Sequence, residues 1–204
     1  MRSIQSSIFD TIVNDLRHSG YSIQKNALPV DLSNALSAEV RAFPASHFQT
    51  AGVGRQTQHH VNQKVRGDKI QWLDDKTTAQ AEWLQWMTRL KNHLNQHLFL
   101  GLDYYESHYA HYESGTFYQR HVDAFQGKSN RVLSTVTYLN PSWDPEDGGA
   151  LRLYLNASDQ QGIDVIPALG TLVVFMSEEF PHEVLPATAE RYSIAGWFRR
   201  REAF

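Results

Sequence analysis

The stretch Tyr118-Gln-Arg-His-Val-Asp-Ala-Phe125 places a histidine and an aspartate two residues apart in a segment otherwise suited to a β-strand. In an extended chain, side chains at positions i and i+2 point to the same face, so His121 and Asp123 are expected to project side by side. Two polar groups on the inner face of a sheet or barrel need partners, and a metal ion is one of the few that satisfies both. The stretch therefore predicts a β fold with a polar site on its inner face.

The composition is that of an ordinary globular chain, with 204 residues, of which 41% are hydrophobic and 20% charged. An all-β chain of this size is often one domain, and we predict a single domain over residues 1–204. A net charge of −3 gives no broad electrostatic reason to bind nucleic acid. No signal-like or membrane-length apolar run is found, so we expect a cytoplasmic protein without a membrane partner. Because cysteine is absent, any metal must be held by nitrogen and oxygen ligands.

Hydrophobic periodicity divides the chain into a helical first part and a β second part. Apolar stripes predict helices from the N-terminus to Gly20, from about Asp31 to Phe43 and from about Thr78 to Phe99, with a short strand at Tyr21 to Gln24. From Tyr104 onward, β-branched and aromatic runs broken by Gly, Pro, Asn and Asp predict eight short strands. These are Tyr104 to Tyr112, Tyr118 to Phe125, Val132 to Leu139, Ala150 to Leu155, Ile163 to Ile166, Thr171 to Met176, His182 to Leu185 and Tyr192 to Phe198.

This order of elements predicts an α+β, mainly β fold, an antiparallel sandwich or jelly roll buttressed by the N-terminal helices. Residues 1–103 would be mainly helical support with a substrate loop, and residues 104–198 the jelly-roll core. The segment from Gln49 to Lys69 is a long excursion, and long ordered excursions are often functional.

A third metal ligand is available in His182, which follows an apolar run typical of a buried strand and begins the next strand. A jelly roll can bring this position beside the strand of His121. Two histidines and one carboxylate form a facial triad that holds Fe(II) and leaves coordination positions open, although zinc hydrolases can use a similar set. Other histidines lie in less suitable places: His18, His93 and His97 on partly exposed helix positions, His59 and His60 in the polar excursion, and His108 and His111 on opposite faces of one strand.

Arg191 favours an oxygenase over a zinc hydrolase. On a strand from Arg191 to Phe198 it shares a face with Ser193, Ala195 and Trp197. An arginine that points into a barrel is costly unless an anion meets it. The far carboxylate of a dicarboxylate such as 2-oxoglutarate would form a bidentate pair with the guanidinium, while a structural alternative is pairing with Glu190 or Glu183.

The order of these motifs resembles the Fe(II)- and 2-oxoglutarate-dependent oxygenases, and more closely the prolyl hydroxylase domain branch that includes the hypoxia-inducible-factor prolyl hydroxylases. The resemblance covers roughly Arg66 to Phe198, implies a double-stranded β-helix, and is closest to compact bacterial forms. The most specific motifs are Arg66-Gly-Asp-Lys-Ile70, Tyr118-Gln-Arg-His-Val-Asp123, Tyr138-Leu-Asn140 with Trp143-Asp144, Gly148-Gly-Ala-Leu-Arg152, Pro181-His-Glu-Val184, Arg191-Tyr192 and Trp197.

The resemblance also implies roles around an iron ion. Fe(II) would be ligated by His121, Asp123 and His182, and the distal carboxylate of 2-oxoglutarate would be bound by Arg191 and shared by Tyr138. Tyr112 matches a tyrosine near the other end of the cosubstrate.

On the substrate side, Tyr118 and Trp197 match aromatics that line the pocket of the target proline. Arg131 matches an arginine near the substrate entrance. Arg66 and Asp68 match a mobile loop that closes over a bound peptide.

The reaction implied is prolyl 4-hydroxylation of a protein loop, coupled to decarboxylation of 2-oxoglutarate to succinate with O₂ as co-reactant and ascorbate as a candidate accessory cofactor. Because bacterial relatives of this branch are associated with a prolyl residue of elongation factor Tu, that protein is the first candidate substrate. Two alternatives stay open: a hydroxylase of a free amino acid or other small molecule, which would need a closed pocket, and a non-catalytic jelly-roll binding module.

Overall fold

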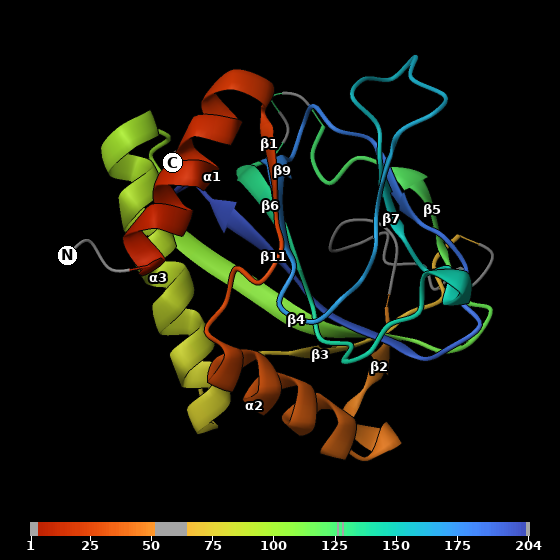
Figure 1. The fold of residues 1–204 in the computed structure, drawn as a ribbon. Coiled ribbons are helices and arrows are strands. Elements are labelled where there is room, and N and C mark those ends of the chain that lie inside the picture. The colour runs from red at the N-terminus through yellow and green to blue at the C-terminus, as the bar shows by residue number, and fades with distance from the viewer. Residues whose placement is uncertain (1–3, 52–64, 126, 128, 203–204) are drawn as a thin grey trace.

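The computed structural model describes residues 4–51, 65–125, 127 and 129–202, and in it the helices lie on one side of two β-sheets (Figure 1). The helices are α1 (Ile4–Ser19), α2 (Val30–Ala42) and α3 (Thr78–Leu98), with short 3₁₀ turns at Ala45–His47 and Pro145–Asp147. The strands are β1 (Tyr21–Gln24), β2 (Gln49–Thr50), β3 (Lys69–Trp72), β4 (Tyr104–Tyr112), β5 (Tyr118–His121), β6 (Arg131–Tyr138), β7 (Leu151–Leu153), β8 (Ile163–Val165), β9 (Leu172–Met176), β10 (His182–Val184) and β11 (Arg191–Arg199).

The strands form a larger sheet in the order β1-β9-β6-β11-β4-β3-β2 and a smaller sheet in the order β5-β10-β7-β8. Every ladder within these sheets is antiparallel, and non-consecutive strands are neighbours, as in a jelly roll. Between the two sheets lies an apolar core that includes Leu151, Val173 and Phe175. The jelly roll predicted from the strand pattern is confirmed.

The helices cover the outer face of the larger sheet because each has one apolar stripe that must be buried. On α3 helical spacing predicts a buried stripe of Trp83, Met87, Leu90, Leu94 and Leu98; the first four have no exposed surface, whereas Leu98 at the end of the helix is only partly buried. The helix begins where the Thr77 hydroxyl accepts a hydrogen bond from the backbone of Gln80 (3.2 Å). None of the helices in the described part of the chain is long and apolar enough to span a membrane.

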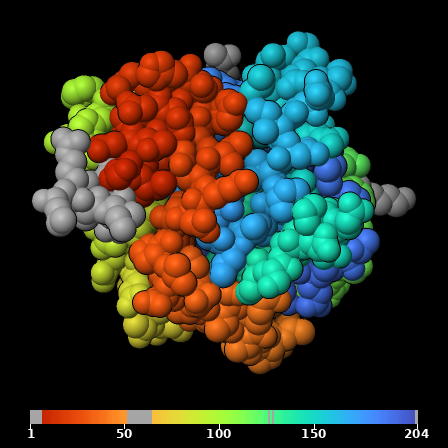
Figure 2. All heavy atoms as spheres, viewed as in Figure 1, coloured from red at the N-terminus to blue at the C-terminus, as the bar shows by residue number. Residues whose placement is uncertain are grey.

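The first and second halves of the chain share one face of the molecule. In the space-filling view, the red to orange surface of α1 and α2 lies directly against the cyan to blue surface of the jelly-roll region (Figure 2). The junction is hydrogen-bonded as well as packed, since β1 pairs with β9 over four residues. The N-terminal part is therefore integrated with the β core, and a single domain over residues 1–204 stays our prediction.

Two features differ from the expectation, one in the first half of the chain and one in the second. The ends of the excursion between Gln49 and Lys69 form β2 and β3, which pair with each other and extend the larger sheet beyond β4. Both strands are short, β2 at the sheet edge and β3 next to it, so they lack the alternation that marks a longer half-buried strand. His59 and His60 lie outside the described residues.

The strand predicted from Tyr118 to Phe125 ends early, at His121. Beyond it the chain bends, and the backbone N–H of Ala124 donates to the carbonyl of Ser177 (3.2 Å), which draws this segment toward the end of β9. Asp123 thus leaves the strand and is placed by a bend.

Candidate active site

The smaller sheet brings His121 and His182 together. Strand β5 pairs antiparallel with β10, and these two histidines are direct partners in the register. Asp123 completes the group: its Oδ1 lies 3.6 Å from Nε2 of His121 and its Oδ2 lies 3.7 Å from Nε2 of His182. Ligand atoms of the three side chains all lie within 4.8 Å of one another. The predicted trio is therefore assembled as a possible metal site.

Backbone carbonyls orient both imidazoles. Nδ1 of His121 donates to the carbonyl of Gln119 (2.7 Å), and Nδ1 of His182 donates to the carbonyl of Phe180 (3.0 Å). Because a carbonyl only accepts, Nδ1 of each ring is the donor, and Nε2 is the atom that faces Asp123 and could ligate a metal. Burial lowers the pKa of His182 to about 4, so this imidazole is neutral at pH 7 and ready to ligate a metal.

The carboxylate of Asp123 is fixed by two strands of the larger sheet. Its Oδ2 accepts hydrogen bonds from the Ser134 hydroxyl (2.6 Å) and from Nε1 of Trp197 (2.9 Å). Burial by itself would raise the pKa of Asp123, but the two histidines and the Ser134 hydroxyl hold it well below its usual range. The carboxylate is thus ionised and its orientation is set by partners other than the histidines.

Arg191 is buried without a carboxylate partner among the described residues. Its side chain is 1% exposed, Nε donates to the carbonyl of Gly149 (2.9 Å), and Nη1 donates to the Ser193 hydroxyl (3.3 Å). The structural alternative to ligand binding, pairing with Glu190 or Glu183, is wrong, because those side chains accept hydrogen bonds from Tyr192 and Tyr154 instead. Burying a guanidinium without an anion lowers the stability of the fold, because the charge loses its hydration and gains no opposite charge.

Two donor groups in this region have no partner within the described residues. They are Nη2 of Arg191 and the hydroxyl of Tyr138, both buried. The guanidinium carbon of Arg191 lies 5.1 Å from the ring centre of Tyr138 and 4.9 Å from that of Tyr112. Burial raises the pKa of Tyr138 to about 12, against the effect of Arg191, so the hydroxyl keeps its proton. Two unpartnered donors and a positive charge fit a carboxylate.

The backbone conformation at position 149 explains why a glycine stands there in the Gly148-Gly149 motif. Its φ of +67° is in the left-handed region, and an added Cβ would lie 2.9 Å from Ala187 Cβ and 3.4 Å from Cδ of Arg191. A side chain here would strain the backbone and crowd the arginine. The glycine therefore serves both the turn and the placement of Arg191.

Arg66, Asp68 and Tyr118 form a connected group beside His121. Arg66 makes two hydrogen bonds to the fully buried Asp68 (2.6 and 2.8 Å), and its guanidinium lies 4.8 Å from the ring centre of Tyr118. Tyr118 in turn stacks on His121, with ring centres 3.6 Å apart. The segment that resembled a mobile loop is thus tied to the trio through an aromatic ring.

Arg131 lies over the ring of Trp197 and beside Asp123. Its guanidinium is 3.7 Å from the ring centre of Trp197, Nη1 donates to the carbonyl of Asp123 (3.4 Å), and Nη2 lies 3.6 Å from Glu106. The arginine therefore has a negative partner and an aromatic surface. Of the five residues expected at the substrate side, Tyr118, Trp197 and Arg131 contact the trio, Arg66 contacts Tyr118, and Asp68 is linked to the site through Arg66.

Sequence reasoning did not identify Ser134 as a site residue. Ser134 and Tyr138 are four residues apart on β6, so the alternation of a strand puts them on one face, and that alternation was the available signal. The strand pattern did not predict the bend after His121 that brings Asp123 close to Ser134. Ser177, which hydrogen-bonds Ser134 (2.9 Å), follows β9 and carried no sequence signal.

Comparison with known proteins gives consistent matches. A family model described as the 2OG-Fe(II) oxygenase superfamily matches residues 107–199. "Egl nine homolog 1" of Rattus norvegicus is 30% identical over 196 residues, which is 92% of this chain and 57% of the relative. The chain thus spans little more than half the length of that curated relative.

Two solved structures are similar over nearly the whole chain. A prolyl-4-hydroxylase of Pseudomonas putida is 44% identical with a TM-score of 0.84, covering 95% of this chain and 100% of that one. A prolyl hydroxylase of Trichoplax adhaerens, in complex with a peptide fragment of the hypoxia inducible factor oxygen degradation domain, is 27% identical with a TM-score of 0.82, covering 96% and 90%.

Proposed function

Because the chain belongs to the 2OG-Fe(II) oxygenase superfamily and to its prolyl hydroxylase branch, we propose that it hydroxylates a prolyl residue of a protein substrate. In that reaction 2-oxoglutarate is decarboxylated to succinate, with O₂ as oxidant. The observation that carries the proposal is the buried Arg191, whose Nη2 lacks a partner within the described residues, as does the hydroxyl of Tyr138, whose ring centre lies 5.1 Å from the guanidinium carbon.

The residues fit the cofactors that the family uses. His121, Asp123 and His182 would hold Fe(II), since two imidazoles and one carboxylate are suitable ligands and leave positions open. Arg191 and Tyr138 would bind the distal carboxylate of 2-oxoglutarate. Bound iron supplies the oxygen chemistry that couples oxidation of 2-oxoglutarate to insertion of one oxygen atom into the substrate.

The chain's own contribution is orientation. Ser134, which holds Asp123, and Tyr138, which lies near Arg191, are four residues apart on one face of β6. The same strand therefore fixes the distance between the metal ligands and the arginine. Ser134 and Trp197 hold one oxygen of Asp123, and backbone carbonyls hold the histidine rings. Such fixed partners set ligand direction before anything binds.

A protein substrate is favoured by the side chains around the trio. Phe125, two residues after Asp123, is 66% exposed, and the rings of Tyr118 and Trp197 lie next to the ligands, the first stacked on His121 and the second hydrogen-bonded to Asp123. The peptide bound to the Trichoplax adhaerens relative supports the same class of substrate. Elongation factor Tu is our first candidate, by the association of bacterial relatives with it, and a free amino acid is the competing substrate.

The cofactor site is tested by anaerobic titration of the metal-free protein with Fe(II) and then 2-oxoglutarate, following the visible charge-transfer absorption of the ternary complex. The wild type should develop the band, and Arg191→Ala should need far more 2-oxoglutarate. Ser129→Ala, a substitution outside the trio and the arginine pocket, is a control. A metal-loaded wild type without the band would remove the oxygenase proposal and leave a binding module or a zinc enzyme.

The substrate is tested separately, with peptides that span the prolyl residues of elongation factor Tu, with and without ascorbate. Mass spectrometry should detect the gain of one oxygen atom on one peptide, in proportion to succinate formed. Free proline serves as the comparison. Turnover of proline with none of any peptide would establish the small-molecule alternative in place of the protein substrate.

A further inference from the structure

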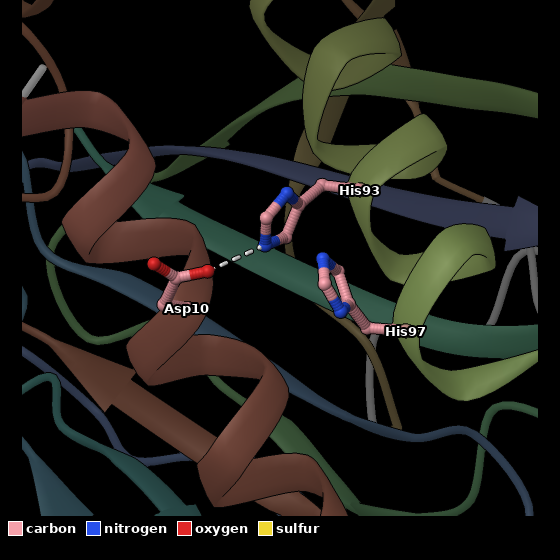
Figure 3. A group of neighbouring side chains, drawn as sticks. All are labelled: Asp10, His93 and His97. Carbon is pink, nitrogen blue, oxygen red and sulfur yellow. Dashed lines mark hydrogen bonds and ion pairs between the residues drawn. The ribbon is translucent and has the colours of Figure 1, made fainter. Parts of the chain in front are cut away.

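A second group of one aspartate and two histidines lies on the helical side of the molecule. Asp10 comes from α1, and His93 and His97 come from α3; their ligand atoms all lie within 4.8 Å of one another. Figure 3 shows the carboxylate of Asp10 turned toward the two imidazole rings across the gap between the helices. These residues belong to neither β5 nor β10 and play no part in the site described above.

The spacing suits a small metal ion. His93 and His97 are four residues apart on α3, one turn of helix, so they share a face. Nε2 of His93 lies 3.0 Å from Oδ1 of Asp10, and the two imidazole centres are 4.4 Å apart. In a tetrahedral zinc site with bonds near 2 Å, ligand atoms are about 3.3 Å from each other. Small rotations of the side chains would meet that geometry.

Local electrostatics favour a cation at this point. The two histidines stand in the last turns of α3, where backbone carbonyls give the helix end a partial negative charge, and Asp10 adds a full one. Among the described residues, the positively charged Arg17 contacts the backbone here: its Nη2 donates to the carbonyl of His97 (3.2 Å).

An ion pair between Asp10 and His93 would account for two of the three side chains and leave out His97. Contact between Asp10 and His93 would help α1 dock on α3, as would the packing of Phe9 against the His93 ring, with ring centres 5.7 Å apart. His97 is exposed, and its ring nitrogens have no hydrogen-bond partner among the described residues. An ion pair does not need this third ligand, whereas a metal site does.

We propose that Asp10, His93 and His97 bind a divalent transition metal ion, with Zn²⁺ as the ion that suits two imidazoles and one carboxylate. Water would complete the coordination, because the group is partly exposed. The bound ion would tie α1 to α3. This site is separate from the proposed iron site and does not depend on its function.

The test is a titration of metal-free full-length protein with Co²⁺, a spectroscopic substitute for Zn²⁺, read by visible absorption and by calorimetric stoichiometry. The wild type should bind two equivalents. One equivalent should remain in His121→Ala/His182→Ala, and the absorption of that variant would report the helical site alone. In that background, His97→Ala should weaken Co²⁺ binding at least tenfold.

His97 is exposed, so its loss should leave the fold intact, which circular dichroism would verify. His18→Ala removes another exposed histidine of the same region and is the matched control, expected to leave the affinity unchanged. The proposal fails if His121→Ala/His182→Ala binds no Co²⁺, or if His18→Ala and His97→Ala weaken binding equally, which would indicate adventitious surface histidines.

Discussion

The two aspartate–histidine clusters contain the same residue types in very different surroundings. In the strand cluster, the side chains are 6–19% exposed, carbonyls hold both Nδ1 atoms, and Asp123 has two further donors. In the helical cluster, His97 is exposed and Asp10 is 39% exposed. Residue type therefore specifies which metals can bind, while the surrounding hydrogen bonds determine how firmly ligands are oriented and what chemistry can follow.

The largest contrast is expected from the same substitution in each cluster. Asp123→Ala should lower peptide hydroxylation by about 1,000-fold or more, beyond the 10–100-fold typical for loss of an outer partner of a ligand. Asp10→Ala should leave turnover unchanged, because it lies outside the proposed iron site. The measurement is succinate formation under saturating Fe(II) and 2-oxoglutarate. A loss of similar size in both variants would break the comparison.

The second contrast concerns the cosubstrate, because only the strand cluster has a buried cation nearby. Arg191→Met should raise the 2-oxoglutarate concentration for half-maximal turnover by about 100-fold, as expected for loss of charge-assisted hydrogen bonds. Without cosubstrate, the same variant should be as stable as the wild type or more so, because an unpaired buried charge has been replaced by an apolar chain of similar length.

Both readings come from one preparation: a kinetic titration and urea denaturation. Ser193→Ala, which removes one neutral acceptor of Arg191, is the graded control and should shift the 2-oxoglutarate requirement much less. If Arg191→Met unfolded at lower urea while its 2-oxoglutarate requirement stayed at the wild-type value, the arginine would be a structural residue.

Much of the fold, and part of the strand cluster, could be predicted because alternation and helical spacing are local properties. The strand at Tyr104–Tyr112 and the stripe on α3 follow from them directly. The spacing of His121 and Asp123 also indicated a shared site, although their proximity comes from a bend after β5 and not from a continuous strand. The roles of these residues in binding and catalysis stay predictions.

Other contacts depend on how elements that are distant in the sequence pack together, and a local sequence pattern does not predict that packing. His93 and His97 were expected on partly exposed helix positions, and they are there, but the approach of Asp10 requires α1 to lie along α3. The link from Ser134 to Asp123 likewise joins separate strands. The edge strand β2 pairs with β3 because the two ends of a long excursion return to one another, and β3 in turn pairs with β4.

Burial of a histidine outside both clusters has a consequence for acid stability. His108 on β4 is 2% exposed, and burial lowers its pKa from the ordinary 6.5 to about 4. Since the unfolded chain then binds more protons than the native chain between about pH 4 and 6.5, stability falls as pH decreases through this range. A shift of this size corresponds to about 3 kcal/mol. His108→Asn should flatten the pH dependence of unfolding free energy by up to that amount.

The control for this measurement is Ser107→Ala, which alters the neighbouring buried position without changing a titratable group. The Ser107 hydroxyl accepts a hydrogen bond from Trp83 (3.3 Å), so its loss should lower stability by about 1 kcal/mol at every pH. Parallel curves for Ser107→Ala and the wild type, with a flatter curve for His108→Asn, are expected. An unchanged slope in His108→Asn would assign acid sensitivity to other groups.

The smallest effect should come from the outer partner that distinguishes the two clusters most directly. Ser134→Ala removes the 2.6 Å hydrogen bond to Asp123 but leaves the donor from Trp197 in place, so the carboxylate keeps one of its two fixed partners. We expect Fe(II) affinity to fall by about tenfold, the lower end for such partners, with little loss of folding stability. Ser134→Thr, which keeps a hydroxyl, should restore most of the affinity. Equal Fe(II) affinity in wild type and Ser134→Ala would mean that the histidine rings and Trp197 suffice to orient the ligands, and that the denser hydrogen bonding of the strand cluster contributes to rigidity more than to metal binding.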